Sequence, residues 1–597
     1  DVESRGLGDV YKRQIWRYNM SYKELYKEWL ENPYFDEQTK KELEAIKDNE
    51  KEIEDRFYTD LEFGTAGLRG VIGAGTNRMN IYTVRKATQG LANYIISMNA
   101  QSRGVAIAYD SRHMSPEFAD EAALCLNANG IKAYVFDSLR PTPELSFAVR
   151  ELNCISGINV TASHNPAEYN GYKVYWEDGA QITPPHDVSI MDAVGNITNF
   201  ADTKTMAKED AIREGLYVQI GRDIDDKYIA RLKKLVIHQD AIDAVNKDIK
   251  IVYTPLHGTG NVPVRRLLKE LGFENVYIVK EQEMPDGDFP TVSYPNPESE
   301  EAFELAVKLG NEVGADILLA TDPDADRLGV YVKGNTPGKY HVLTGNMSGC
   351  LLAEYEISQM KETGNIPDDG ALIKTIVTTN LANDIAKYYN VELIEVLTGF
   401  KYIGEKILGF ENTGKGHYLF GFEESYGCLI GTHARDKDAV VATMALCEAV
   451  AYYKTKGMSL WDKMIEMYER YGYWQDGVQA ITLKGKEGIE KIQNTIDRLR
   501  ADVPTEIAGY KVISARDYKF DTIKNMSTGE VTPTGLPKSN VLYYDLEGGA
   551  WVCVRPSGTE PKLKFYYGIK GVSFEDAKKK EKELGEYMIN MVNSMLQ

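Results

Sequence analysis

The sequence predicts a multidomain α/β protein whose last domain is α+β, and three observations support this fold class. From about residue 105 to residue 453, apolar strand-like runs alternate with helical segments, a pattern typical of α/β domains with largely parallel sheets. Several of these runs end directly in polar loops, as strands do at the ligand-binding edge of such sheets. After about residue 471 the pattern changes to short strands flanked by helices, which favours an antiparallel α+β domain.

A chain of 597 residues is too long for one hydrophobic core. We expect four domains, at residues 20–230, 231–338, 339–470 and 471–597. Residues 9–14 correspond to the translation of GAT GTG TAT AAG AGA CAG, which resembles a transposase end used in sequencing libraries. We therefore expect residues 1–19 to be non-native read-through and Met20 to be the natural start. A charged helical arm is expected from there to about residue 49.

The composition is that of an ordinary soluble globular protein, with 43% hydrophobic and 26% charged residues. The formal net charge of -20 argues against nucleic acid or an anionic membrane as a partner. Phosphates can bind such a chain only where Arg, Lys or a metal is concentrated locally. No apolar run approaches the roughly 18 residues of a membrane span. Six cysteines without a Cys-x-x-Cys pair indicate buried thiols in a reducing cytoplasm: Cys125, Cys154, Cys350, Cys428, Cys447 and Cys553.

A serine-containing loop follows the apolar run at residues 155–160. It reads Thr161-Ala162-Ser163-His164-Asn165-Pro166. A hydroxyl held at the end of a rigid strand is suited to a nucleophile or phosphate carrier. The alternative is a solvent loop in which Ser163 only satisfies nearby backbone groups. The other elements expected in this unit are strands at 105–109 and 133–136 and helices at 115–129 and 142–152.

Two cations of the first unit are candidate phosphate or hydroxyl partners. Arg69 lies in the stretch 63–70, which we expect to be a glycine-rich loop whose backbone can approach a ligand. Lys173 lies ten residues after Ser163, at the expected start of a return strand that could bring its ammonium group beside the hydroxyl. An ordinary turn and a solvated lysine are the alternatives.

An acidic triplet, Asp322, Asp324 and Asp326, follows an apolar strand at 317–320. In an extended segment residues at i, i+2 and i+4 share a face, so the three carboxylates are expected to converge. Three carboxylates this close repel one another unless a cation lies between them, and ligation by oxygen atoms alone suits Mg²⁺. An EF-hand calcium loop is excluded because Arg327 and Lys333 occupy its sixth and twelfth positions. An acidic surface turn is the remaining alternative. The other strands expected here are at 249–253, 276–279 and 328–332.

The third unit has expected strands at 372–378, 391–396 and 417–420, and each ends in polar residues. The second is followed by Thr398, Gly399 and Lys401, and the third by Glu423 and Ser425. We expect Glu423 and Ser425 to share a face of an extended segment and to bind sugar hydroxyls. The run His-Ala-Arg-Asp-Lys-Asp at 433–438 precedes an apolar helix at 439–453, and Asp436 or Asp438 could simply cap that helix.

The last unit carries a loop, residues 555–562, that gathers a guanidinium group, hydroxyls and a glycine amide. These groups are typical phosphate ligands. The elements expected around it are helices at 486–501 and 574–595 and strands at 510–513, 541–544, 551–554 and 563–567.

With these four loops in this order over residues 20–597, the chain resembles the α-D-phosphohexomutase superfamily, in particular its phosphoglucomutase/phosphopentomutase branch. The resemblance implies three α/β domains with mixed sheets and a mobile C-terminal α+β domain around a central cleft. It implies an isomerase, an intramolecular phosphotransferase that interconverts α-D-glucose 1-phosphate and glucose 6-phosphate. The phosphate would pass through a phosphoserine at Ser163, with glucose 1,6-bisphosphate as intermediate and activator.

The resemblance also implies roles for individual residues. Mg²⁺ would be held by phosphorylated Ser163 and by Asp322, Asp324 and Asp326. Lys173 and Lys437 are the acid/base candidates, Arg327 would steady the transferred phosphoryl group, and His164 is grouped with these catalytic residues. The implied substrate-binding residues are Arg69, Thr398, Gly399, Lys401, Glu423, Ser425, Arg555, Ser557, Gly558, Thr559 and Lys564.

Alternatives remain for the substrate and for the reaction. Glu423–Ser425 resembles the glucose-type loop and departs from the Gly-Glu-x-Ser-Gly-His form, so phosphopentomutase and phosphomannomutase activities stay open. A Mg²⁺-dependent sugar phosphatase would not need the sugar loop, and a silent binding protein would be expected to have lost Ser163 or an Asp of the triplet. Sugar monophosphates are the expected partners of a cytoplasmic monomer or small homo-oligomer, with no nucleic acid and no membrane.

Overall fold

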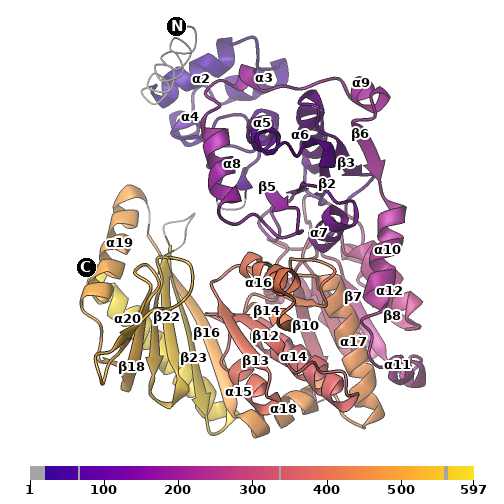
Figure 1. The fold of residues 1–597 in the computed structure, drawn as a ribbon, viewed down its shortest axis with the longest axis vertical. Helices are drawn as coiled ribbons and strands as arrows, with labels where there is room; N and C mark the ends of the chain where they lie inside the picture. Colours follow the sequence, from indigo (N-terminus) through magenta and orange to yellow (C-terminus); the bar gives the residue numbers. More distant parts are fainter. Residues whose placement is uncertain are drawn as a thin grey trace. The chain divides into compact units, whose positions relative to one another are not determined.

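The computed structural model describes residues 20–64, 67–334, 336, 338–483, 485–556 and 562–596 (Figure 1). The expected read-through at 1–19 and the phosphate-loop residues Ser557, Gly558 and Thr559 lie outside the described residues. The chain divides into two compact units. One comprises the chain up to Tyr331 together with Gly427–Tyr452, and the other comprises Val332–Tyr426 and the chain from Tyr453 onward. The four domain boundaries given above stay a prediction.

The expected opening arm contains two short helices, α2 (Tyr22–Glu31) and α3 (Glu37–Ala45), and a third, α4 (Glu50–Phe57), follows it. The side chains of Ser21, Asp36 and Asn49 cap their N-termini, as expected of these residue types. Their apolar faces pack with residues of the following domain in an aromatic cluster that includes Trp29, Phe35, Phe57, Tyr82 and Phe200.

The first α/β domain contains a mixed six-stranded sheet in the order β1-β5-β4-β2-β3-β6. The strands β2, β3, β4 and β6 run parallel, while β5 is antiparallel to both β4 and β1. The core between the sheet and its helices is built from Val, Ile, Leu and Ala side chains. The elements are β1 (Gly67–Val71), α5 (Ile81–Ser97), β2 (Val105–Tyr109), α6 (Ser115–Ala128), β3 (Ala133–Phe136), α7 (Thr142–Glu151), β4 (Ser156–Val160), β5 (Tyr169–Trp176), α8 (His186–Gly195), α9 (Lys208–Arg213), β6 (Tyr217–Ile220) and α10 (Arg222–Lys233).

The prediction of a loop over residues 63–70 is wrong for its second half, because β1 begins at Gly67. A Cβ atom on Gly67 would lie 1.8 Å from the carbonyl oxygen of Tyr172. Glycine at this position therefore lets β1 approach β5 closely, which places Arg69 on an edge strand directly opposite Gly171.

Most of the second sheet lies in the same unit and has β7 between β8 and β9, all parallel. The strands β7, β8, β9 and β10 match the predicted ones to within one residue at each end. The elements are α11 (Gln239–Val245), β7 (Lys250–Thr254), α12 (Asn261–Glu270), β8 (Asn275–Ile278), α13 (Glu300–Val313), β9 (Ile317–Thr321) and β10 (Leu328–Lys333). This unit also includes β15 (Cys428–Ile430) and most of α17 (Ala439–Thr455).

The second unit begins with a sheet in which β12 pairs in parallel with β13 and β14. The elements are β11 (Tyr340–Leu343), α14 (Gly345–Glu362), β12 (Gly370–Thr375), α15 (Leu381–Tyr389), β13 (Glu392–Val396), α16 (Phe400–Thr413), β14 (His417–Phe422) and α18 (Leu460–Tyr471).

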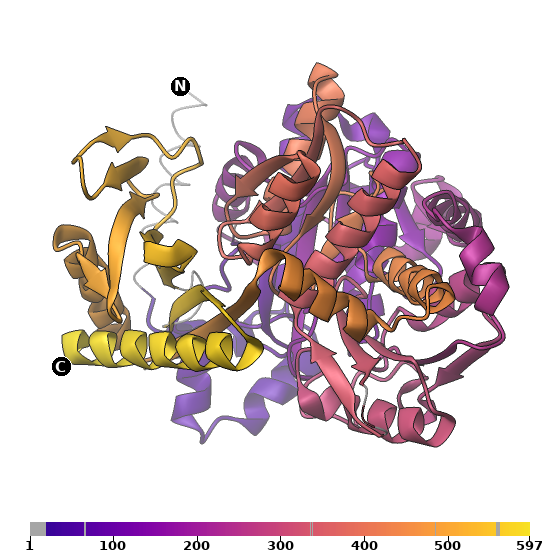
Figure 2. The same cartoon turned by 90° about the horizontal axis from the view of Figure 1, so that it is seen from below.

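The C-terminal part of this unit is an antiparallel sheet that packs against α19 and α20, as the α+β prediction requires. Figure 2 shows α20 as a long helix beneath this sheet. The strand β16, which pairs with β23 along its full length, was not predicted because Gln475, Asp476 and Gly477 interrupt its apolar pattern. The elements are β16 (Tyr473–Thr482), α19 (Gly485–Ala501), β17 (Glu506–Ile507), β18 (Tyr510–Asp517), β19 (Thr522–Asn525), β20 (Val531–Thr532), β21 (Leu542–Leu546), β22 (Trp551–Pro556), β23 (Lys562–Gly571) and α20 (Phe574–Leu596).

Two further expectations concern the whole chain. All six cysteines are buried and none forms a disulfide, as predicted. Among the helices described, none combines the length and apolar character that crossing a bilayer requires.

Candidate active site

Ser163 lies in the loop after β4, at the carboxyl edge of the first sheet, and is 4% exposed. Its backbone is left-handed, with a φ of 54°, a conformation that costs a non-glycine residue about 1–2 kcal/mol. The backbone N–H of Ser163 donates to the hydroxyl of Thr161 at 2.8 Å. A strained residue held in this way is typical of a functional loop.

Arg112 holds the serine loop in this conformation. Its buried guanidinium group donates to the carbonyl oxygens of Ser163 at 2.7 Å, Pro166 at 2.8 Å and Tyr169 at 3.0 Å, and also to that of Asn165. Arg112 was not among the residues predicted from the sequence. It could have been identified from its place in the loop after β2, the strand that pairs with β4, because polar residues at the carboxyl ends of neighbouring parallel strands meet at one edge of the sheet.

The acidic triplet converges as predicted, with ligand atoms of Asp322, Asp324 and Asp326 all within 4.8 Å of one another. The expected extended segment is wrong, because these residues form a turn. Asp322 Oδ1 accepts hydrogen bonds from the backbone N–H groups of Asp326 at 3.1 Å and Arg327 at 3.0 Å. Ala325 is left-handed within this turn. The turn, and not strand alternation, therefore gathers the three carboxylates.

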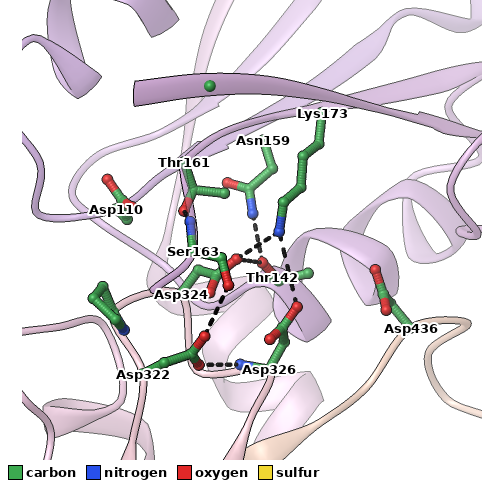
Figure 3. A network of polar contacts seen from close by, with 12 residues as sticks. Asp110, Thr142, Asn159, Thr161, Ser163, Lys173, Asp322, Asp324, Asp326 and Asp436 are labelled. Carbon is green, nitrogen blue, oxygen red and sulfur yellow. Dashed lines mark hydrogen bonds and ion pairs between the residues drawn. The ribbon is translucent and has the colours of Figure 1, made fainter. Parts of the chain in front are cut away.

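The serine loop and the triplet are directly linked, as Figure 3 shows. Ser163 Oγ donates to Asp322 Oδ2 at 2.9 Å. All three carboxylates are buried, and burial together with their mutual repulsion raises the pKa of Asp322 well above its usual range. For Asp324, burial is opposed and outweighed by the charge and hydrogen bond of Lys173, so its pKa is lowered. The triplet therefore depends on neighbouring cations for its charge balance.

Two lysines supply positive charge at the triplet. Lys173 Nζ donates to Asp324 Oδ2 at 2.8 Å and lies 3.8 Å from Asp326 Oδ2 (Figure 3). Lys437 Nζ lies 3.1 Å from the same oxygen of Asp326. The prediction that Lys173 starts a strand is wrong. It lies within β5, opposite both Gly67 of β1 and Asn159 of β4, so two neighbouring strands fix its backbone.

Thr142 and Asn159 complete the surroundings of Asp324 and were also missed. The Thr142 hydroxyl donates to Asp324 Oδ2 at 2.9 Å, and Asn159 Nδ2 donates to the Thr142 hydroxyl at 2.7 Å (Figure 3). Asn159 is a polar residue inside an otherwise apolar strand. Because a buried polar group needs a hydrogen-bond partner, this position could have been predicted from the sequence to take part in a buried polar network.

The remaining predicted residues of this unit surround the serine loop and the triplet. His164 Nδ1 lies 3.2 Å from Ser163 Oγ, and burial together with nearby arginine charges lowers the pKa of His164 well below its ordinary range. Arg327 Nη1 donates to Glu298 at 3.1 Å, and its Nε lies 4.0 Å from Asp326. Arg69 is exposed and donates to Asn165 at 3.4 Å.

The predicted sugar-loop residues lie in the second unit. Glu423 is buried and accepts a hydrogen bond at 3.1 Å from the backbone N–H of Gly399, which precedes α16. The expectation that Glu423 and Ser425 lie in an extended segment is wrong, because the chain bends here and Tyr426 is left-handed. Thr398 and Lys401 flank Gly399 in the chain, so both predicted segments meet at the Gly399–Glu423 contact.

Arg555, from the predicted phosphate loop, and Lys564, from the strand after that loop, face each other across the β22–β23 pair. Like charges directly opposite each other in a sheet destabilise it. Such a pair suits an anion that lies between the two side chains. The loop that joins these strands holds Ser557, Gly558 and Thr559, whose predicted role is therefore not tested.

Three family models match this chain. They are the phosphoglucomutase/phosphomannomutase alpha/beta/alpha domains I at residues 60–201, II at 226–335 and III at 344–471. The chain is 37% identical over 524 residues to a phosphoglucomutase of Staphylococcus haemolyticus, covering 87% of this chain and 92% of the relative. It is also 37% identical over 538 residues to a phosphoglucomutase of Staphylococcus aureus, covering 89% and 94%.

Solved structures show the same fold. A phosphoglucomutase/phosphomannomutase family protein from Burkholderia thailandensis matches with a TM-score of 0.62 at 20% identity, covering 90% of this chain and 98% of that one. The phosphoglucomutase pp63/parafusin from Paramecium, in an open form, matches with a TM-score of 0.66 at 17% identity, covering 90% and 95%. This chain therefore belongs to the phosphoglucomutase/phosphomannomutase family of the α-D-phosphohexomutase superfamily, which confirms the resemblance inferred from its loops.

Proposed function

We propose that this protein is a phosphoglucomutase that interconverts α-D-glucose 1-phosphate and glucose 6-phosphate. The observation that carries the proposal is the hydrogen bond from Ser163 Oγ to Asp322 in a buried acidic triplet. The relatives that are 37% identical over most of the chain are phosphoglucomutases. In this proposal phosphorylated Ser163 donates its phosphoryl group to a sugar monophosphate, and the resulting glucose 1,6-bisphosphate returns its other phosphate to Ser163.

The residues of the triplet fit Mg²⁺. Three buried carboxylates converge, and Oδ1 of Asp324 and Oδ1 of Asp326 have no hydrogen-bond partner within the described part of the chain. Oxygen ligands of this kind and density suit a hard divalent cation. Asp322, Asp324, Asp326 and the phosphorylated Ser163 would hold it. When bound, the cation neutralises charge on the phosphoryl group during transfer.

The chain's own groups would then position the reactants and move protons. Lys173 and Lys437 are the candidates for taking a proton from the attacking sugar hydroxyl and returning it to the leaving group. His164, beside Ser163 Oγ, is held mainly neutral by its lowered pKa and can accept a hydrogen bond. Arg327 is the candidate for steadying the transferred phosphoryl group.

The second unit would bind the sugar and the phosphate that is not transferred. We assign the sugar hydroxyls to Glu423 and Ser425, with Thr398, Gly399 and Lys401 alongside, because the Gly399–Glu423 contact joins these segments. The opposed cations Arg555 and Lys564 support a phosphate site. The six cysteines are buried and form no disulfide, which favours a reducing, cytoplasmic location. We also propose that the protein is a monomer or a small homo-oligomer.

The proposal is tested by mutase assays with Mg²⁺ and a trace of sugar bisphosphate. Glucose 1-phosphate, mannose 1-phosphate and ribose 1-phosphate are compared, and free phosphate is measured in the same tubes. Fastest conversion of glucose 1-phosphate without phosphate release is expected. Preference for the pentose would mean a phosphopentomutase with the same chemistry, and phosphate release without isomerisation would mean a phosphatase.

A further inference from the structure

The loop between β15 and α17 brings Lys437 to the acidic triplet, but the proposed function does not explain the residues around that lysine. The loop lies in the same compact unit as Ser163. Two residues of α7 hold it in place. Ser146 Oγ accepts a hydrogen bond from the backbone N–H of Arg435 at 2.8 Å, and Arg150 Nη1 donates to the carbonyl oxygen of His433 at 3.2 Å. The first α/β domain therefore fixes the backbone that carries Lys437.

The side chain of Lys437 is fixed along its length. Its stem packs on Gly427, where an added Cβ would lie 2.1 Å from Lys437 Cδ. Its Nζ contacts two carboxylates, Asp436 Oδ1 at 2.9 Å and Asp326 Oδ2 at 3.1 Å. A free lysine side chain samples many rotamers, so these contacts, formed on folding, hold the ammonium group in one place.

Asp436 is itself held by groups from the first α/β domain. It is buried, and its Oδ2 accepts hydrogen bonds from the Tyr175 hydroxyl at 2.9 Å and from Gln181 Nε2 at 3.1 Å. Tyr175 lies two residues after Lys173 on β5, so the two side chains leave the same face of that strand. One strand therefore places Lys173 against the triplet directly and supports Lys437 through Asp436.

We propose that Asp436 is a positioning residue, which Tyr175 and Gln181 hold in place so that its carboxylate keeps Lys437 Nζ beside Asp326. The assignment rests on the proposed function for its effect on catalysis. Its structural part, the fixing of Lys437, does not depend on which reaction is catalysed. A displaced catalytic group costs much more in rate than in binding, because the reacting geometry is lost while the substrate contacts remain.

The neighbouring carboxylate offers a matched control. Asp438 Oδ1 caps α17 by accepting from the N–H groups of Val440 and Val441 at 2.8 and 2.9 Å. Its Oδ2 accepts a hydrogen bond from the Tyr228 hydroxyl at 2.8 Å and lies 2.7 Å from His433 Nε2. Tyr228→Phe and Tyr175→Phe thus remove the same chemical group from adjacent buried carboxylates, and only Tyr175 supports Asp436.

The kinetic test uses Asp436→Asn, Lys437→Met and the double variant. Asp436→Asn should lower kcat about 10–100-fold with less than about a threefold change in KM. In the double variant the loss should equal that of Lys437→Met alone, because Asp436 acts through the lysine. Tyr175→Phe should lower kcat by a smaller factor, whereas Tyr228→Phe should lower the melting temperature and leave kcat unchanged. Losses that multiply in the double variant would overturn the assignment.

A second readout is independent of activity. Lys437 is labelled with acetic anhydride in metal-free protein, and its rate of modification is followed by mass spectrometry alongside that of Lys173. Asp436→Asn and Tyr175→Phe should each speed modification of Lys437, by about tenfold for the first, because the hydrogen bond to Asp436 keeps the nitrogen engaged and less accessible to the reagent. Tyr228→Phe should not. Equal labelling rates in wild type and Asp436→Asn would contradict the positioning role of Asp436, whatever reaction the protein catalyses. A lack of mutase activity would instead refute the proposed function and leave the labelling result to decide the role of Asp436.

Discussion

Ser163 Oγ donates a 2.9 Å hydrogen bond to Asp322 Oδ2, which joins two loops 159 residues apart in the sequence. The hydroxyl proposed as phosphate carrier is thus already in contact with one of the three carboxylates proposed as metal ligands.

Ser163→Ala should abolish mutase turnover and the transfer of label from sugar bisphosphate to the protein. The Ser163 hydroxyl is the only group of the protein that the proposed reaction phosphorylates, so no neighbouring side chain replaces it. Label incorporation is followed by mass spectrometry, and the melting temperature checks the fold. Ser102→Ala, at an exposed serine of the same domain, is the control. Turnover within a few-fold of wild type would refute the role of Ser163.

Removing the metal should abolish activity, and adding Mg²⁺ back should restore it. Asp324→Asn should weaken Mg²⁺ binding at least about tenfold, because it removes one anionic ligand from the buried triplet. Titration calorimetry measures the affinity, with the exposed Asp202→Asn as the matched substitution. Unchanged affinity in the triplet variant would place the cation elsewhere.

Arg112→Met should destabilise the protein by about 3–5 kcal/mol, since it leaves Asp110 buried without its charge partner. Arg112→Lys keeps the charge, yet one ammonium group cannot replace the forked donors that reach the serine loop. We therefore expect this variant to fold and to lose activity about tenfold or more, mainly in kcat. Chemical denaturation and steady-state kinetics are the measurements. An active, stable Arg112→Met protein would contradict the assignment.

Arg555→Ala should raise KM for glucose 1-phosphate about 10–100-fold, which corresponds to losing one or two charged hydrogen bonds to phosphate. Since Lys564 faces Arg555 across the strands, removing one cation also relieves repulsion. The ligand-free protein should therefore be no less stable than wild type. A fall in stability with an unchanged KM would show that the pair is structural.

The Glu144→Gln variant should be more stable than wild type, and the difference in stability should grow as the pH rises. Glu144 is buried on α7, and burial, helped by Asp225, raises its pKa well above the usual 4.5. The folded state therefore binds the proton more tightly than the unfolded state, so wild-type stability is lost as pH rises from about 4.5 through the folded pKa. Melting temperatures from pH 5 to pH 9 should show a growing advantage of the glutamine variant. The exposed Glu151→Gln on the same helix is the control, and a pH-independent difference would contradict the explanation.

Much of the fold was visible in local patterns. The apolar runs that became β2, β3, β4, β7 and β9 were predicted almost to the residue because each is a short, buried strand bounded by turn residues. Where the pattern misled, tertiary packing was responsible. Gly67 was predicted to lie in a loop, but it belongs to β1 and allows the close approach of β5. The polar residues of β16 do not follow a strand pattern, and this strand is stabilised by pairing with β23.

The sequence by itself determined which stretches carry the chemistry. Ser163 follows an apolar strand, three aspartates follow another, and both facts depend only on neighbouring residues. The tertiary structure alone decided which side chains support them. Three contacts illustrate this. Arg112 contacts Ser163 at a sequence separation of 51 residues, Thr142 contacts Asp324 at 182, and Asp436 contacts Tyr175 at 261. The physical reason is that hydrogen bonds and ion pairs depend on distance in space, which no local periodicity encodes, whereas strands and turns depend on residues adjacent in the chain.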